Sequence, residues 1–353
     1  MILHILLLVI VTVIATLWTP KQKKKNAFWC SFVFFSLIAF RNNGSVDDAT
    51  VYVPIYKMLS ENNEGFVGWA EPFTQLLILI STYLGWSVKG LYALFAFLSA
   101  LFLSLSLPYF IRNRSQNILY WIGLFLLHYL SCANVIVQVL ASAMLTYIVV
   151  LQLKGYKKLS FVLFILLSFV HSASIIAIVL WFAINYRDRL FTKKRMAYIP
   201  ILCLVIGLLG GIKFILVHGT ALVPNEYEYL VDAVVQGESS DKKGLLIMLT
   251  FTSFLYTIIH INIKTIDYYQ KAACIATAIY LSFYVFSFGV LFLFRIAYYF
   301  IFFSPFAFAY IPLERKSKSL FALLLVVYFI YTLFHFDVLF IVDYQGSLNL
   351  SKQ

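Results

Sequence analysis

Three residues combine a reactive side chain with an apolar setting, and they are the candidates for catalysis: Asp48, Glu71 and His171. Glu71 opens an apolar run, where a partly desolvated carboxylate suits proton abstraction. Asp48 suits either a ligand for sugar hydroxyls or a general base. His171 lies inside a long apolar stretch that has no other ionisable group. Together these residues predict acid–base chemistry.

Each of these residues also has a purely structural interpretation. Asp48 has the residue type of a helix N-cap. Glu71 precedes Pro72, and a first-turn glutamate is favoured by the helix dipole. A solitary histidine in an apolar run is often a structural residue with satisfied hydrogen bonds. The choice of general base between Asp48 and Glu71 stays open.

Two tyrosines and two arginines could bind substrate. Asp48, Tyr52 and Tyr56 follow one another at intervals of four, so they share one face if 47–59 is a short helix. The tyrosines could then stack on sugars. Arg41 and Arg295 border apolar runs and suit bidentate phosphate recognition. The alternative is that each arginine pairs with a nearby carboxylate.

The composition requires a membrane setting for these residues. Of 353 residues, 62% are hydrophobic and only 12% are charged. A bundle of membrane helices needs that much apolar surface, whereas a soluble core does not. We predict an all-α polytopic membrane protein, a single integral domain over 1–353, with about 11–14 spanning or partly spanning helices. Hydrophobic segments lie near 2–19, 27–40, 69–84, 90–111, 117–131, 133–153, 159–184, 197–217, 244–262, 272–292, 294–312 and 319–342.

The net charge of +12 lies mostly in short basic runs between these segments, which is typical of cytoplasmic loops rather than of a nucleic-acid-binding face. With these runs inside, the loop 41–68, with its short helix, and the acidic loop 218–243 are external. The apolar stretch 159–184 must then turn near His171, below the outer surface. Arg41, Asp48, Glu71, Asn134, His171 and Arg295 all fall near external helix ends, which predicts a cavity open to the outside.

Several short motifs, in order, resemble the EpsG family of Wzy-like bacterial polysaccharide polymerases. They are FRNNGSVDDATVYVPIY, WAEPFTQLL, NVIVQVLASAML, FVHSASIIAI and FRIAYYF. The resemblance places the family pattern on Arg41, Gly44, Asp48, Tyr52, Glu71-Pro72, Gln138, His171-Ser172, Arg295 and Tyr299-Phe300. Val137 stands where the family has an arginine, and the spacing after Gly44 leaves Asp47 or Asp48 as the family's aspartate.

The resemblance implies a fold similar to GT-C glycosyltransferases and a place in the bacterial plasma membrane. It implies that undecaprenyl-diphosphate-linked oligosaccharide repeats are joined at the outer face, without a cofactor or metal. Gln138 and Tyr299 join the tyrosines as sugar-binding candidates. Arg41 and Arg295 would offset the charge of the diphosphate. Membrane lipid and a chain-length regulator protein are the further partners that it implies.

Other functions fit part of the pattern. A transporter of lipid-linked sugars also needs a cationic cavity, but internal repeats and charges near the midplane are typical of transporters, and the sequence has no convincing repeat. An acyltransferase would need an acid close to its histidine, whereas Ser172 follows His171. Another lipid-linked glycosyltransferase or ligase remains an alternative.

Overall fold

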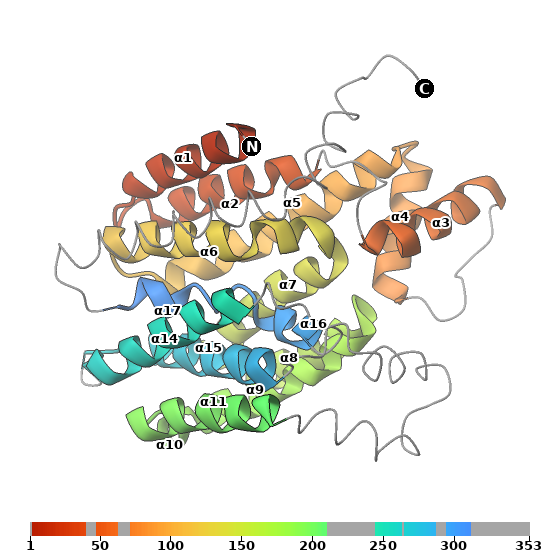
Figure 1. Ribbon diagram of the computed structural model, residues 1–353. Helices are drawn as coiled ribbons and strands as arrows, with labels where there is room; N and C mark the ends of the chain where they lie inside the picture. The colour runs from red at the N-terminus through yellow and green to blue at the C-terminus, as the bar shows by residue number, and fades with distance from the viewer. Residues whose placement is uncertain are drawn as a thin grey trace, which may run out of the picture. The chain divides into compact units, whose positions relative to one another are not determined.

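The computed structural model describes residues 2–39, 47–62, 71–209, 244–262, 265–286 and 294–311. Every regular element among these residues is a helix, in agreement with the predicted all-α class (Figure 1). The chain divides into two compact units, Met1–Ile175 with Leu313–Gln353, and Ile176–Pro312. The predicted loop 218–243 and segment 319–342 lie outside the described residues, and the prediction of one integral membrane domain stays untested.

The first unit contains eight described α-helices followed by two 3₁₀ segments. They are α1 Ile2–Thr16, α2 Lys23–Ala39, α3 Asp47–Asn62, α4 Pro72–Tyr83, α5 Val88–Phe110, α6 Arg114–Asn134, α7 Ile136–Leu153, α8 Lys157–Leu166, η1 Leu167–Phe169 and η2 Ser172–Ala177. The division between the units falls inside η2. By length and composition, α5 and α7 could each cross a membrane. The larger number of spans remains a prediction.

The core of the first unit forms around α5, which packs against α2 and α7. One face of α5 buries Ala96, Ser99, Ala100 and Leu103. Their spacing of three or four residues places them in a single stripe, and small side chains let helices approach closely in a membrane. Nearly all of α7 is buried, as expected for the central helix of a bundle.

Aromatic side chains and an asparagine pair fasten the remaining N-terminal helices. Phe34 of α2 contacts Trp121, Phe125 and Tyr129 of α6, with ring centroids 5.5–6.0 Å apart. At the other end of α6, Asn117 Nδ2 donates to Asn26 Oδ1 over 2.7 Å. Such bonds satisfy polar groups that would be costly to bury alone.

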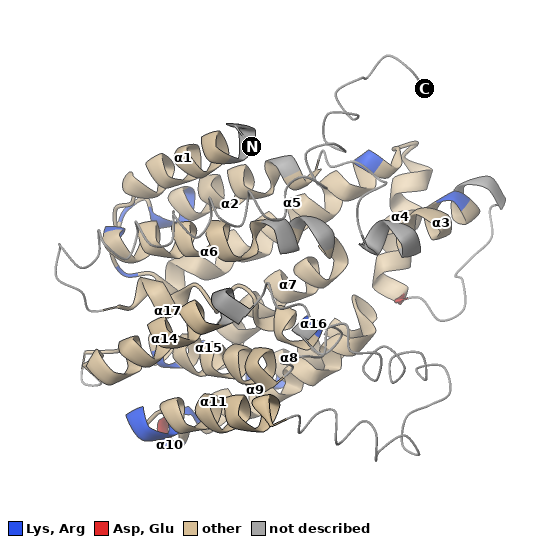
Figure 2. Cartoon of the chain, viewed as in Figure 1, with Lys and Arg blue, Asp and Glu red and all other residues tan. Residues whose placement is uncertain are grey.

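The basic turns of the first unit lie at one end of its helices. Figure 2 shows Lys and Arg gathered where α1 meets α2 and where α5 meets α6. Lys154, in the α7–α8 turn, lies 4.3 Å from the ring centroid of Tyr109, in the last turn of α5. The three turns therefore share one side, as the prediction of a common cytoplasmic face requires.

The second unit comprises short and long helices around α15. Its described elements are α9 Ile178–Asn185, α10 Arg187–Leu190, α11 Lys193–Leu208, α14 Gly244–His260, α15 Tyr268–Phe286, α16 Phe294–Ala297, η6 Tyr298–Phe300 and α17 Phe306–Ala309. Gly207 permits the close packing of α11 on α15, because a Cβ there would lie 2.4 Å from the carbonyl oxygen of Val285.

The apolar segment near 294–312 is not the continuous helix that its hydropathy suggests. It forms short helical pieces joined by turns, and residues 297–311 are all buried. Irregular backbone at membrane depth needs internal hydrogen-bond partners. Thr257 of α14 donates to the carbonyl of Ala307, and Thr277 of α15 donates to that of Phe303, each over 2.7 Å.

Candidate functional site

Glu71 occupies the N-cap position of α4, with Pro72 directly after it. Proline is favoured in the first helical position because its missing N–H would have no helical partner there. The Glu71 side chain makes no capping hydrogen bond to its own helix and is only 11% exposed. Its position at the start of α4 still agrees with the helix-dipole interpretation, but the carboxylate is held by other segments of the chain.

Two hydrogen-bond donors from distant segments hold the Glu71 carboxylate. The Tyr52 hydroxyl, on α3, donates to Oε2 over 3.2 Å. The backbone N–H of Ser172, at the start of η2, donates to Oε1 over 3.4 Å. Tyr52 is itself buried. Each carboxylate oxygen thus has a donor from a different segment, which fixes the orientation of the group.

His171 completes this cluster. Its Nδ1 lies 3.9 Å from Glu71 Oε1, and its side chain is 24% exposed. The separation is longer than a hydrogen bond, so the two groups interact as an ion pair when the imidazole is protonated. A carboxylate beside a partly exposed histidine can take up and pass on a proton.

A break in helical structure positions His171. Helix α8 ends at Leu166 and continues as η1 to Phe169, and η2 begins at Ser172, so the break falls where the sequence analysis expects a turn. The Thr74 hydroxyl, one turn into α4, donates to the carbonyl of Val170 over 2.7 Å. This bond ties the residue before His171 to α4, the helix that starts directly after Glu71.

Sequence reasoning did not identify Thr74. A threonine three residues after Glu71 is an unremarkable helix residue, and its partner lies 96 residues further along the chain. The Ser172 backbone N–H was equally hidden, because every residue except proline offers that group.

Two other predicted ligands lie elsewhere in the first unit. The Tyr56 hydroxyl donates to the carbonyl of Trp86, in the turn that follows α4. Tyr56 is thus held at the opposite end of α4 from Glu71. Gln138 is buried in the first turn of α7, 3% exposed. Their proposed contacts with sugars remain predictions.

The remaining predicted site residues belong to the second unit or have side chains that lie outside the described residues. In the second unit, Arg295 lies exposed in α16 and Tyr299 lies buried in η6. Asp48 belongs to the first turn of α3, but its side chain lies outside the described residues, as does the whole of Arg41. The alternative between Asp48 and Glu71 as general base is therefore untested.

Metal ligands do not gather within the described ranges. No group of three or more His, Cys, Asp or Glu side chains there could hold a metal ion. The prediction of metal-independent chemistry stays a prediction, since parts of the predicted cavity fall outside those ranges.

Comparison with known proteins identifies one family. The sequence model of the EpsG family matches residues 5–345, which is nearly the whole chain. No curated protein and no solved structure matches. The match covers the three segments that meet at the carboxylate, which carry Tyr52, Glu71 and His171. The chain belongs to the EpsG family.

Proposed function

We propose that this protein polymerises undecaprenyl-diphosphate-linked oligosaccharide repeats at the outer face of the bacterial plasma membrane. The product would be an O-antigen, capsular polysaccharide or exopolysaccharide. The observation that carries the proposal is the meeting of Tyr52, Glu71 and His171 at one carboxylate. Three motifs that resemble the family pattern thus converge in a chain that belongs to that family.

The reaction is a glycosyl transfer. A hydroxyl oxygen of the incoming repeat forms a bond to the anomeric carbon of the growing chain. The bond from that carbon to the lipid diphosphate breaks, and the diphosphate leaves with its electron pair. The hydroxyl proton passes to a general base, for which Glu71 is suited by its low exposure and its fixed orientation.

His171 is proposed to assist Glu71. An imidazole near a carboxylate can relay the proton that the carboxylate takes up, and the 24% exposure of His171 leaves it accessible from outside. Arg295 and Arg41 are proposed to offset the negative charge on the leaving diphosphate, which makes a divalent metal unnecessary. Asp48 remains the alternative base.

The rest of the proposal follows the family resemblance. The chain would be a multi-pass protein with a GT-C-like arrangement and an externally open cavity, and a chain-length regulator would be its protein partner. A transporter of the same lipids is the alternative from another class. The partly buried carboxylate–histidine pair favours chemistry, because a carboxylate beside a partly exposed imidazole can take up and pass on a proton.

The proposal is tested by polysaccharide profiling in a strain that lacks its own polymerase. Wild type should restore the ladder of repeats, whereas Glu71→Gln, His171→Ala and Arg295→Ala should leave a single repeat at equal membrane abundance. Asp188→Asn is the matched control, since Asp188 is a carboxylate 69% exposed in a surface ion pair with Lys271. Full ladders from Glu71→Gln would refute the assigned site. If even wild type failed to elongate the repeats, the transporter would be favoured.

A further inference from the structure

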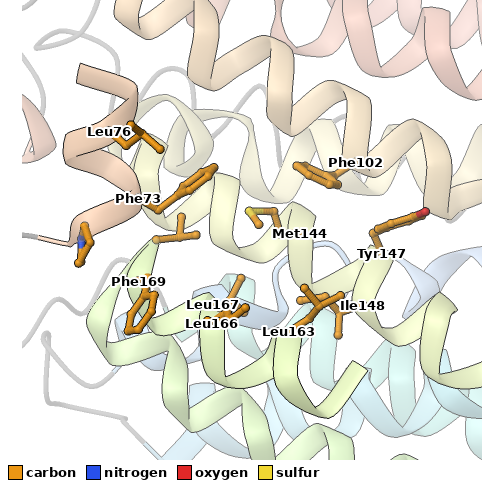
Figure 3. Close-up of a pocket in the computed structure, with 12 residues that line it drawn as sticks. Phe73, Leu76, Phe102, Met144, Tyr147, Ile148, Leu163, Leu166, Leu167 and Phe169 are labelled. Carbon is orange, nitrogen blue, oxygen red and sulfur yellow. The ribbon is translucent and has the colours of Figure 1, made fainter. Parts of the chain in front are cut away.

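An apolar groove of about 560 Å³ lies within the first unit, and Figure 3 shows the side chains that line it. Twelve residues line it, and all are apolar apart from the hydroxyl of Tyr147. They come from α4, α5, α7, α8 and η1, and include Phe73, Phe102, Met144, Leu166 and Phe169. The volume falls in the range of about 300–1,000 Å³ that is usual for small-molecule sites.

The groove begins at the candidate catalytic residues. Pro72, in its wall, directly follows Glu71, and Val170, also in its wall, directly precedes His171. Neighbouring Cα atoms are about 3.8 Å apart, so the backbones of Glu71 and His171 lie next to one end of the groove, whose wall their chain neighbours form. The bond from Thr74 to the carbonyl of Val170 holds α4 and the segment before His171 together at this end.

The groove extends away from that end toward the basic side of the first unit. Its lining on α8 and η1 runs from Val170 back to Leu163, about 10 Å at 1.5 Å per helical residue. This direction leads toward the α7–α8 turn that carries Lys154, which the sequence predicts to be cytoplasmic. A molecule held here would therefore have its polar end outward and its apolar end deeper in the membrane.

The groove has a buried floor and an open rim. Ile148 and Leu167 are almost fully buried, whereas Leu76, Leu166 and Phe169 are each 41–48% exposed. The shape suits a long apolar chain that lies along the protein and continues into lipid. A sugar does not fit this lining, because its hydroxyl groups would lose hydrogen bonds to water without replacement.

We propose that this groove holds the first isoprenoid units of the lipid-linked substrate, with the diphosphate at the Glu71–His171 end. The inference rests on the proposed function, because that reaction places a polyprenyl diphosphate next to the reacting sugar carbon. From the groove, the diphosphate meets His171, which carries positive charge when protonated. An acyl chain of a bulk phospholipid is the competing occupant, and the experiment separates the two.

Equilibrium binding of tritiated undecaprenyl diphosphate tests the proposal, using full-length protein in phosphatidylcholine nanodiscs. Leu166→Trp fills the groove from its rim. Ile165→Trp is the matched control, because Ile165 is the neighbouring α8 residue, is also 41% exposed and does not line the groove. We expect about tenfold weaker binding by Leu166→Trp, or about 1.4 kcal/mol, and unchanged binding by Ile165→Trp.

Photocrosslinking keeps the test independent of variant folding. A polyprenyl diphosphate with a diazirine near its diphosphate should label wild-type peptides that contain Phe73 or Phe169. Equal binding by both tryptophan variants, or labelling confined to other peptides, would overturn the proposal. Displacement of the probe by phosphatidylglycerol at equal concentration would also overturn it, since the groove would then be a general lipid site.

The Glu71→Gln variant separates this inference from the proposed function. It should fail to elongate repeats but still bind undecaprenyl diphosphate, with an affinity equal to or above that of wild type, because a negative charge near the diphosphate is removed. The wild-type protein could bind the lipid in a way that depends on Leu166 and yet never elongate repeats. That result would refute the proposed polymerase function and retain the groove as a polyprenyl site. If the wild-type protein elongates repeats but Leu166→Trp binds the lipid as wild type does, only the proposal for the groove is refuted.

Discussion

The hydroxyl of Tyr52 donates a hydrogen bond to Glu71 Oε2 over 3.2 Å, and this bond joins α3 to the residue directly before α4. Both side chains are largely shielded from solvent. In a shielded environment, a donor with fixed geometry determines which way the carboxylate faces, and water cannot replace it easily. The orientation of the proposed general base therefore depends on α3, a helix that lies 19 residues away from it along the chain at Tyr52.

Tyr52→Phe should slow polymerisation without abolishing it. The ring still fills its site, but Glu71 loses a donor to one oxygen and becomes less well oriented. We expect a roughly tenfold lower rate of repeat joining, or about 1.4 kcal/mol in the barrier. Tyr83→Phe is the control, because Tyr83 is 92% exposed at the end of α4. Equal rates for both variants would show that the Tyr52 bond has no part in catalysis.

Thr74→Val should destabilise the protein as well as disturb its site. The substitution keeps the side-chain shape and leaves the Val170 carbonyl without this donor, which costs about 1–3 kcal/mol for a buried group. Thermal unfolding in detergent measures the loss. Thr82→Val serves as the control on the same helix, since the Thr82 hydroxyl bonds to the carbonyl of Leu79, within its own helix. If both variants unfold alike, the α4–η1 connection is unimportant.

Gly207→Ala should lower the stability of the second unit. The new Cβ would meet the backbone oxygen of Val285 at 2.4 Å, so α11 and α15 must separate. Overpacking of this kind costs about 1–3 kcal/mol. Val205→Ala, at an exposed position on α11, should unfold close to wild type. An unchanged unfolding midpoint for Gly207→Ala would argue against the close approach of the two helices.

Labelling of single cysteines tests the predicted orientation in the membrane. In a background without the four native cysteines, Ala173→Cys, at an exposed position next to the site, should react with a membrane-impermeant maleimide added outside cells. Tyr156→Cys, in the exposed α7–α8 turn, should react only after permeabilisation. The reverse pattern would place the Glu71–His171 pair on the cytoplasmic side, and would rule out joining of repeats at the outer face.

The sequence predicted the helical class and singled out Glu71 and His171, which lie near each other in the structure, for identifiable reasons. Pro72 determined the start of α4, and the isolated ionisable residues Glu71 and His171 stood out against an apolar background. The sequence could place both residues in one cavity but could not predict their direct contact, because they are 100 positions apart in the chain. The irregular segment after Arg295 was not predicted, since its hydropathy is that of a helix and two of its carbonyls, those of Phe303 and Ala307, accept from threonines of α14 and α15.

Elongation by purified protein in nanodiscs, with a synthetic undecaprenyl-diphosphate-linked repeat as the only substrate, tests the proposed reaction and the role of Glu71. Wild type should release one undecaprenyl diphosphate for each new glycosidic bond. The Glu71→Gln substitution preserves the side-chain shape and removes the base. The rate of elongation by this variant should be lower by about 10²-fold or more, although the variant still binds the lipid. A Glu71→Gln protein that elongates repeats at the wild-type rate would contradict the account.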